Sequence, residues 1–310
     1  VFNDDQIKNI LKSALNITNS IYLDRIVRIA EGNARLAMLA GRLACDSDCL
    51  NSIADASQLY DNYYGCFFKK DELYSDKHIC ITAGVVAFLG AIHLDHIDTF
   101  LEILLNKGIN KEAFVENIKE LHEQEFINVY SDKAVQFSEQ CLANYLIKYV
   151  FFDKKLLSLS EMIDVCFQTH RERTISSINT LLYIFHNKEL FSFVQKEVLF
   201  IWNKLFREDS PYYFEFVKSF FFLNPTETLL LLKNKIDKEK RVNISISDID
   251  TDEGKNDESI SDDIINILGG FADMEDFPAA LDLFFQYYLK RPDLYMQFYH
   301  AAKRNFGISE

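Results

Sequence analysis

The sequence predicts a mainly α-helical fold with one small β-hairpin. Apolar residues recur at the i, i+3 and i+4 spacing of a helix along most of the 310 residues, and this spacing places them on one buried face. Only residues 127–137 change to alternation, the pattern of a half-buried strand pair. We expect three parts: a helical bundle over residues 1–74, a winged-helix domain over 75–152, and an α-solenoid-like stack of antiparallel helices over 153–310.

Composition indicates a folded protein without broad affinity for nucleic acid. Hydrophobic residues make up 48% of the chain, enough for a sizeable core. The formal net charge is -14, whereas non-specific binding to nucleic acid depends mainly on lysine and arginine. The first ten residues lack the basic and apolar regions of a secretory signal.

The cysteines and the apolar runs indicate the compartment. Six cysteines without a CxxC pair are typical of free thiols in a reducing environment, so we expect a cytoplasmic protein. The longest uncharged run, residues 79–94, is shorter than the ~20 residues that a membrane span needs. We therefore expect no membrane partner.

Capping signals divide the first part into short helices. Asn3 followed by Gln6 predicts a capping box at the start of the first helix. Gly32 stands where a helix end needs a left-handed residue, and Asn33 is then expected to cap the helix over 35–44. That helix is rich in Ala and Gly, which let neighbouring helices approach closely.

Residues 49–74 continue with helical spacing. Their apolar residues share one side, which we expect to contact the next domain. This apolar side comprises Ile53, Ala56, Leu59, Tyr60, Tyr63 and Tyr64.

The second part has the element order of a winged helix. The expected helices are 79–92, 98–105 and one that begins after the cap residue Asn110. The alternation over 127–137 surrounds a polar turn at 131–133, which predicts a hairpin. A further helix is expected over 138–150.

The third part shows only helical patterning, and all four prolines lie in it. Pro is favoured in the first turn of a helix, so each proline is expected to begin one. The expected starts are Ser210-Pro211, Asn224-Pro225, Pro278 and Pro292. Residues 237–263 are strongly charged and poor in large apolar residues, so we expect an acidic, partly disordered surface loop there.

The stretch RIAEGNARLAMLAGRLA, residues 28–44, resembles a known turn. It is similar to the "A-x-G-N-P-R-x-A" turn in the lid of STAND-type ATPases, the AAA+-derived family that includes NACHT and NB-ARC proteins. The matching residues are Ala30, Gly32, Asn33, Arg35 and Ala37, with Ala34 in place of the proline. The resemblance implies a C-terminal part of a P-loop ATPase, namely lid, winged helix and helical sensor region, without its N-terminal nucleotide-binding domain.

The resemblance also assigns site residues. Arg35 matches the sensor-2 arginine that reaches towards the γ-phosphate, and Asn33 stands beside it; the alternative is a solvated Arg35. In such proteins a Met-His-Asp motif at the start of the helix after the wing senses ADP. The matching residues are Phe137-Ser138-Glu139, which lack the histidine. Ser138 retains a hydrogen-bond donor for a regulatory contact, and Glu139 stands next to it. The alternative is that Ser138 is a plain N-cap.

The chain lacks the residues of a complete ATPase. A P-loop needs G-x-x-x-x-G-K-[ST], and the one Gly-Lys pair is Gly254-Lys255 in the acidic stretch. We expect no catalytic residues and no ATPase activity in this segment; ATP or ADP with Mg is implied for the parent protein. His93 and His96 lack a third and fourth ligand nearby, so we expect no metal site.

Function is therefore expected to be regulatory. By resemblance, the helical stack receives a protein trigger, and the winged helix couples this signal to the nucleotide state of a parent ATPase that can oligomerise. Such proteins often serve in bacterial anti-phage defence or signalling. The alternative is a stand-alone helical scaffold that binds proteins. A DNA-binding regulator is disfavoured because the third helix of the second part is rich in glutamate.

Overall fold

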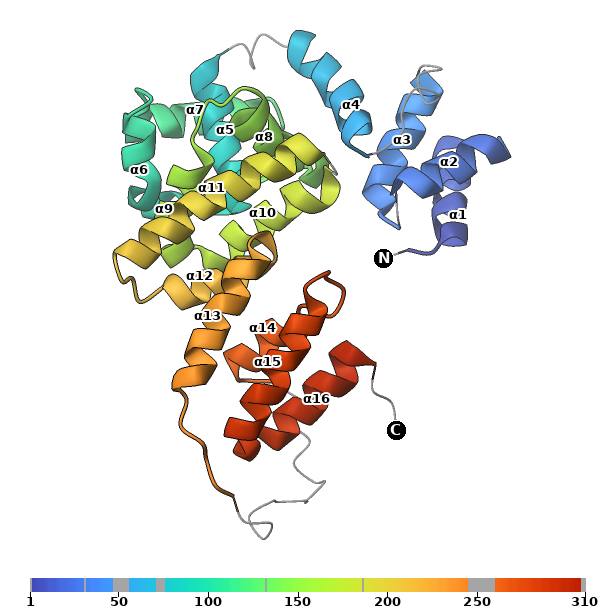
Figure 1. Ribbon diagram of the computed structural model, residues 1–310. Coiled ribbons are helices and arrows are strands. Elements are labelled where there is room, and N and C mark those ends of the chain that lie inside the picture. Colours follow the sequence, from blue (N-terminus) through green and yellow to red (C-terminus); the bar gives the residue numbers. More distant parts are fainter. Residues whose placement is uncertain are drawn as a thin grey trace. The chain divides into compact units, whose positions relative to one another are not determined.

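The computed structural model describes residues 2–30, 32–46, 56–70, 76–131, 133–185, 187–244 and 260–307. The chain divides into two compact units, Val1–Glu197 and Val198–Glu310. The described residues form sixteen α-helices and one three-stranded antiparallel sheet (Figure 1). The predicted class, mainly α-helical with a small β-hairpin, is confirmed. The predicted boundaries near 74 and 152 remain predictions.

The first unit begins with a bundle of three helices. These are α1 Asp4–Leu15, α2 Ser20–Ala30 and α3 Ala34–Asp46. The capping box of α1 is confirmed, because Asn3 Oδ1 accepts from Gln6 N at 2.9 Å and Gln6 Oε1 accepts from Asn3 N at 3.0 Å. α1 and α3 approach closely at Gly41, where a Cβ atom would meet Leu11 and Leu15. The small residues of α3 therefore permit the packing of this bundle.

A winged helix follows in the same unit. Its elements, preceded by α4 Ala56–Lys70, are α5 Lys77–Leu89, β1 Ala91–His93, α6 Asp98–Leu105, α7 Lys111–Glu123, β2 Ile127–Tyr130, β3 Ala134–Phe137 and α8 Gln140–Lys148. The hairpin is confirmed: β2 and β3 pair with Val129 opposite Val135. Helix, strand, two helices and a hairpin in the sheet order β1-β3-β2 make the topology of a winged helix.

The first strand of this sheet was not predicted. The sequence pattern suggested that the first helix runs to residue 92, but α5 ends at Leu89. Gly90 adopts φ 73°, a conformation that favours glycine, and turns the chain out of the helix. Ile92 then lies opposite Val135 of β3 and is buried. The prediction of a single hairpin is thereby corrected to three strands.

Helix α5 is the centre of the unit. All of its residues from Ile79 to Leu89 are buried, which is typical of a helix covered on every side. α7, α8 and α10 pack against it.

After α8 come a π-helical turn Tyr149–Asp153, α9 Leu159–Thr169, α10 Arg171–Ile184 and α11 Lys188–Arg207. The division between the units falls within α11.

The second unit has its own apolar core. Its elements after α11 are α12 Tyr213–Phe220, a 3-10 turn Phe221–Leu223, α13 Pro225–Lys238, α14 Asp263–Gly269, α15 Phe277–Lys290, a 3-10 turn Pro292–Leu294 and α16 Tyr295–Phe306. α13, α14, α15 and α16 enclose one core. The most buried core residues include Leu232, Ile236, Ile265, Leu268, Phe271 and Ala280.

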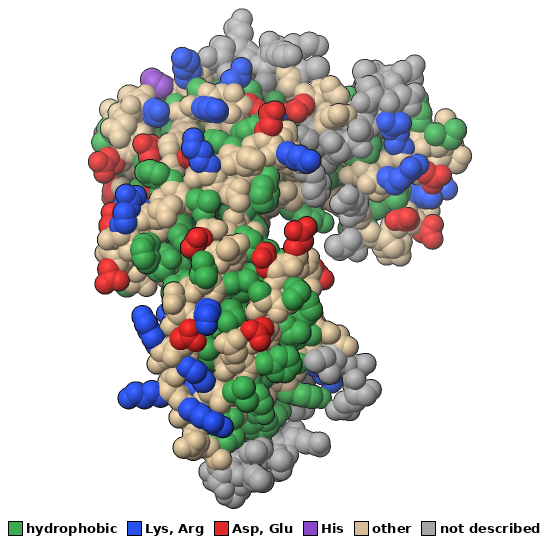
Figure 2. Space-filling view, viewed as in Figure 1, with side chains coloured by type: hydrophobic (Ala, Val, Ile, Leu, Met, Phe, Trp, Pro, Cys, Tyr) green, Lys and Arg blue, Asp and Glu red, His purple; other side chains and the backbone are tan. Residues whose placement is uncertain are grey.

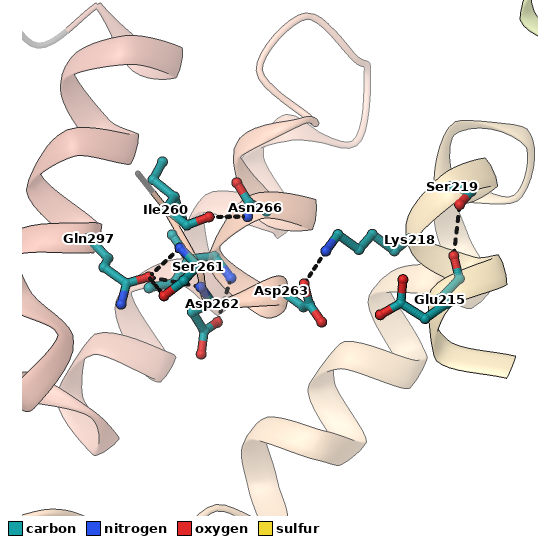
Figure 3. Close-up of polar contacts among 10 residues, drawn as sticks. Glu215, Lys218, Ser219, Ile260, Ser261, Asp262, Asp263, Asn266 and Gln297 are labelled. Atoms are coloured by element: carbon teal, nitrogen blue, oxygen red, sulfur yellow. Dashed lines mark hydrogen bonds and ion pairs between the residues drawn. The ribbon is translucent and has the colours of Figure 1, made fainter. Parts of the chain in front are cut away.

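Polar contacts hold the start of α14 (Figure 3). Gln297 Oε1 accepts from the backbone N–H groups of Ser261 at 3.0 Å and Asp262 at 2.8 Å. Asp262 caps α14, and its second carboxylate oxygen accepts from the Tyr287 hydroxyl at 3.0 Å. Lys218 pairs with Asp263. The chain is therefore fixed where it enters the core.

The prolines begin helical segments, with one exception. Pro225 is the first residue of α13, Pro278 the second of α15, and Pro292 begins a 3-10 turn. Pro211 lies in a turn, because α12 begins only at Tyr213. Asn224 precedes Pro225 but makes no side-chain cap hydrogen bond.

The predicted acidic loop is described only at its ends. Residues 239–244 and 260–262 are not helical, and residues 245–259 lie outside the described residues. Within the described part of the chain, no helix has the length and apolar character to cross a membrane.

The close approach of α5 to the π-helical turn after α8 provides a stability test. A methyl group at Gly84 would lie 2.7 Å from Val150 Cγ1 and 2.9 Å from its Cβ. Gly84→Ala should lower the free energy of unfolding by about 1–3 kcal/mol, because Val150 is rigid and fully buried. Denaturant titration followed by circular dichroism measures this.

Gly65→Ala in α4 is the matched control. Its added Cβ atom would lie 3.5 Å from the Tyr145 hydroxyl, an ordinary contact. Since alanine favours a helix over glycine by about 1 kcal/mol, this variant should be neutral or stabilising. Equal losses for both variants would contradict the close packing at Gly84.

Candidate functional site

The turn between α2 and α3 forms as predicted. Gly32 adopts φ 79°, and Asn33 Oδ1 accepts from Arg35 N at 3.0 Å and Leu36 N at 3.3 Å. Asn33 is thus confirmed as the cap of α3. Arg35 is the second residue of α3 and is exposed. The predicted nucleotide contacts of both residues remain predictions.

Ser138 and Glu139 connect the wing to α8. The Ser138 hydroxyl lies 2.8 Å from the carbonyl oxygen of Glu125 and 2.9 Å from that of Phe126, to which it donates. Glu139 occupies the N-cap position of α8 without a side-chain cap hydrogen bond. The alternative interpretation of Ser138 as the N-cap is therefore wrong. Its hydroxyl instead fixes the end of α7 to the sheet.

Two buried tyrosines lie between α4 and α8. Tyr60 is 0% and Tyr64 3% exposed. The Tyr64 ring lies 5.4 Å from that of Tyr145 in α8, and the Tyr60 ring 5.2 Å from that of Phe185. Neither buried hydroxyl has a hydrogen-bond partner of normal geometry among the described residues, although Cys141 and Asn144 lie near the Tyr60 hydroxyl and Glu139 lies near that of Tyr64. An unpaired buried hydroxyl is unusual and costs free energy.

The polar groups nearest these hydroxyls come from α8 and its cap. Burial is the main cause that raises the pKa of Tyr60 and Tyr64, and the neighbouring Cys141 and Glu139 raise it further. Burial also raises the pKa of the Cys141 thiol; the nearby Tyr60 hydroxyl opposes this shift, Glu139 adds to it, and the charge of Arg35 opposes it.

The charges of two predicted residues affect the same buried thiol. Glu139 at the start of α8 raises the pKa of Cys141, and Arg35 of α3 lowers it. We call the surroundings of Cys141, Tyr60 and Tyr64 the α4–α8 junction. Ser138 instead directs its hydroxyl to the carbonyl groups of Glu125 and Phe126, between α7 and β2.

A buried lysine completes the α4–α8 junction. Lys148 is 4% exposed, and its Nζ donates to Asp61 Oδ1 of α4 at 2.8 Å and to Asp153 Oδ2 at 3.0 Å. Burial alone would lower the pKa of Lys148, but the hydrogen bonds to both aspartates outweigh it and the pKa is raised. Burial raises the pKa of Asp153, against the effect of Lys148. A charged group thus links α4 to α8.

Sequence reasoning did not identify this group. It treated Tyr60 and Tyr64 as part of an apolar side and did not single out Lys148. The signal was present, because Lys148 is the one charged residue in the run NYLIKYVFF, residues 144–152. A lysine within an apolar helix needs a carboxylate partner. Its partner Asp61 lies 87 residues away in sequence, so the pair could not be recognised from spacing.

The described residues of the junction do not form a cluster of metal ligands. Nowhere in the described ranges do three or more His, Cys, Asp or Glu side chains gather to hold a metal ion. The rings of His93 and His96 lie 5.1 Å apart, and His93 Nδ1 accepts from Asp95 N at 3.3 Å. In the α4–α8 junction, by contrast, the hydrogen bonds of Lys148 and the contact between the Tyr64 and Tyr145 rings are suited to holding α4 against α8.

The exposed face of α7 is acidic. In a DNA-binding winged helix, the corresponding helix enters the major groove. Its exposed acidic residues are Glu112, Glu116, Glu120 and Glu123, against the exposed bases Lys111 and Lys119. Lys111 also lies 3.9 Å from Asp98.

Comparison with known proteins gives no relative: the chain matches no protein-family model, no curated protein and no solved structure at a significant level.

The unpaired hydroxyls provide a test of the junction. Tyr60→Phe removes an oxygen without a partner, so the free energy of unfolding should stay unchanged or rise by up to about 1 kcal/mol. The control is Tyr287→Phe, which removes a donor to Asp262 at 3.0 Å and should cost about 1 kcal/mol. Hydrogen exchange in α8 and in α15 reports each unit separately. A clear loss for Tyr60→Phe would show that its hydroxyl is paired.

DNA binding should be absent or very weak. The acidic face of α7 would repel phosphates, and few basic residues are available to release counterions. Fluorescence anisotropy with duplex DNA at 50 and 200 mM salt measures this. Sub-micromolar affinity that falls steeply with salt would contradict the prediction.

Proposed function

We propose that this chain is the regulatory segment of a STAND-type ATPase. In this proposal, α1–α4 form the lid, α5 to α8 the winged helix, and the helices from α9 onward the sensor region. The observation that carries the proposal is the turn between α2 and α3, where Gly32 adopts φ 79°, Asn33 caps α3 and Arg35 is exposed in the first turn of the helix. The resemblance predicts nucleotide contacts for Asn33 and Arg35, and a regulatory role for Ser138 and Glu139.

The chemistry of Arg35 fits this role. An arginine fork matches phosphate geometry, and its charge persists at all relevant pH values. Arg35 is exposed and stands in the first turn of α3, where the N-terminus of the helix also favours anions. In the parent protein, a nucleotide-binding domain would hold ATP or ADP with Mg, and Arg35 would reach the terminal phosphate.

The α4–α8 junction would couple this contact to the winged helix. α4 is held by the Asp61–Lys148 pair and by aromatic packing, but it carries two unpaired hydroxyls. Small changes at Arg35 or Glu139 would therefore shift the balance between a docked and a released α4. A cytoplasmic location is part of this proposal.

A stand-alone protein-binding scaffold is the second candidate. Helix α11 supports it, because Phe200 and Phe206, in the part of the helix that belongs to the second unit, are 59% and 63% exposed. Exposed aromatic residues are frequent in protein interfaces. The same residues would receive the protein trigger if the chain belongs to an ATPase.

The gene distinguishes the two candidates. An ATPase requires a G-x-x-x-x-G-K-[ST] loop encoded upstream of residue 1. Its absence from the complete coding sequence would remove the ATPase proposal and leave the scaffold.

The substitution Arg35→Ala in the longer gene product tests whether Arg35 contacts the terminal phosphate. ATP turnover should fall at least about tenfold, equivalent to ~1.4 kcal/mol, because a phosphate contact is lost. The melting temperature should change little, since Arg35 is exposed. Arg42→Ala is the control: Arg42 is exposed in the same helix, two turns further along. Equal turnover in the two variants would contradict the role of Arg35.

A further inference from the structure

Helix α15 has two apolar faces. The inner face, with Ala280, Leu283, Phe284 and Tyr287, is buried in the core of the second unit. The outer face carries Phe285, Tyr288 and Leu289, which are 54%, 39% and 62% exposed. Their i, i+3 and i+4 spacing places these three on one side of the helix.

The outer face continues onto α16. The rings of Tyr288 and Phe298 lie 5.2 Å apart, so this part of α16 lies beside the outer face of α15. Met296 and Tyr299, on either side of Phe298 in sequence, are each 42% exposed. Together these exposed residues form a surface that we call the α15–α16 face: Phe285, Tyr288, Leu289, Met296 and Tyr299. Figure 2 shows hydrophobic side chains gathered over this part of the second unit.

Two opposite charges border the α15–α16 face. Asp282 precedes Phe285 by three residues on α15, and Lys303 follows Tyr299 by four on α16, so each lies on the outer edge of its helix. Both are exposed. Asp282 accepts from Gln286 at 2.7 Å, and Lys303 has no ion pair within the described ranges.

The two charges lie at the same level along the helices. α15 and α16 run antiparallel: Phe277 contacts Phe306 at one end, and Tyr288 contacts Phe298 at the other. Interpolation between these contacts places Asp282 level with residues 302–303. The α15–α16 face therefore has a negative edge and a positive edge, directly across from each other.

We propose that a second copy of this chain binds to the α15–α16 face. A two-fold axis parallel to the helices places α15 of one copy over α16 of the other at the same level. Asp282 of each copy then meets Lys303 of the other, and the exposed apolar side chains cover one another. A surface with opposite charges at equal heights on its two edges is self-complementary under this operation, as an isologous interface requires.

The interface is small, so the dimer is weak. Helices of 14 and 12 residues present a face about 20 Å long and two helices wide. Since two helices side by side are about 20 Å wide, the face covers roughly 400 Å² on each copy, below the ~1,200 Å² in total that standard specific interfaces bury. We therefore expect dimerisation that depends on protein concentration. The proposal is independent of the nucleotide role.

The apolar part of the proposal is tested by analytical ultracentrifugation of the full chain over a concentration series. The wild type should show a monomer–dimer equilibrium, and Leu289→Asp should weaken it at least tenfold. Leu230→Asp is the matched control, because Leu230 is 50% exposed on α13 of the same unit. A wild type that stays monomeric up to about 1 mM, or equal weakening by both variants, would overturn the proposal.

A charge exchange tests the orientation. Asp282→Lys and Lys303→Asp should each weaken the dimer, since each places like charges together at two sites. The double variant restores opposite charges and should restore dimerisation to within about threefold of the wild type. Circular dichroism confirms that each variant is folded. A double variant as weak as either single variant would overturn the two-fold arrangement.

Discussion

The first unit depends on the complete burial of α5. Every residue from Ile79 to Leu89 is covered, so neighbouring elements must surround this helix on all sides. Gly84 lets Val150, next to the C-terminal end of α8, approach closely, and Gly90 turns the chain into β1 at the end of the helix. The winged helix, the wing and the start of α8 take their positions from these contacts. On the α8 side, the α4–α8 junction is therefore built on elements that pack around α5.

In the α4–α8 junction, contributions that lower the free energy of unfolding stand beside contributions that raise it. Each unpaired buried hydroxyl costs about 1–3 kcal/mol, and desolvation of Lys148 adds to the cost. Aromatic contacts and the bonds from Lys148 to two aspartates offset these terms. Removing Asp61 alone would leave Lys148 with a single carboxylate partner.

Local signals could be predicted from the sequence, and long-range ones could not. The caps at Asn3, Asn33 and Asn110 form as predicted, since each depends on a backbone N–H two or three residues away. The hairpin could also be predicted, because its alternating strands and its turn are close together in the sequence. β1 has only three residues and no alternation to detect, and it exists because β3 lies beside it. The pairing of Lys148 with Asp61 likewise depends on the tertiary fold. For the candidate site, the sequence indicated Arg35 and Glu139 separately, but not the tyrosines that lie near them.

The position of Arg35 argues for a role outside helix stability. The N-terminus of a helix carries a partial positive charge, so acidic residues stabilise its first turn and basic residues oppose it, each by about 0.3–1 kcal/mol. The first turn of α3 has no acidic residue and has Arg35 instead. Asn33 already satisfies two of the free backbone N–H groups there. An exposed arginine beside a helix N-terminus raises the local positive potential in a chain whose net charge is -14. This cost to the helix is offset when an anion binds, which is the reason for proposing a phosphate as its partner.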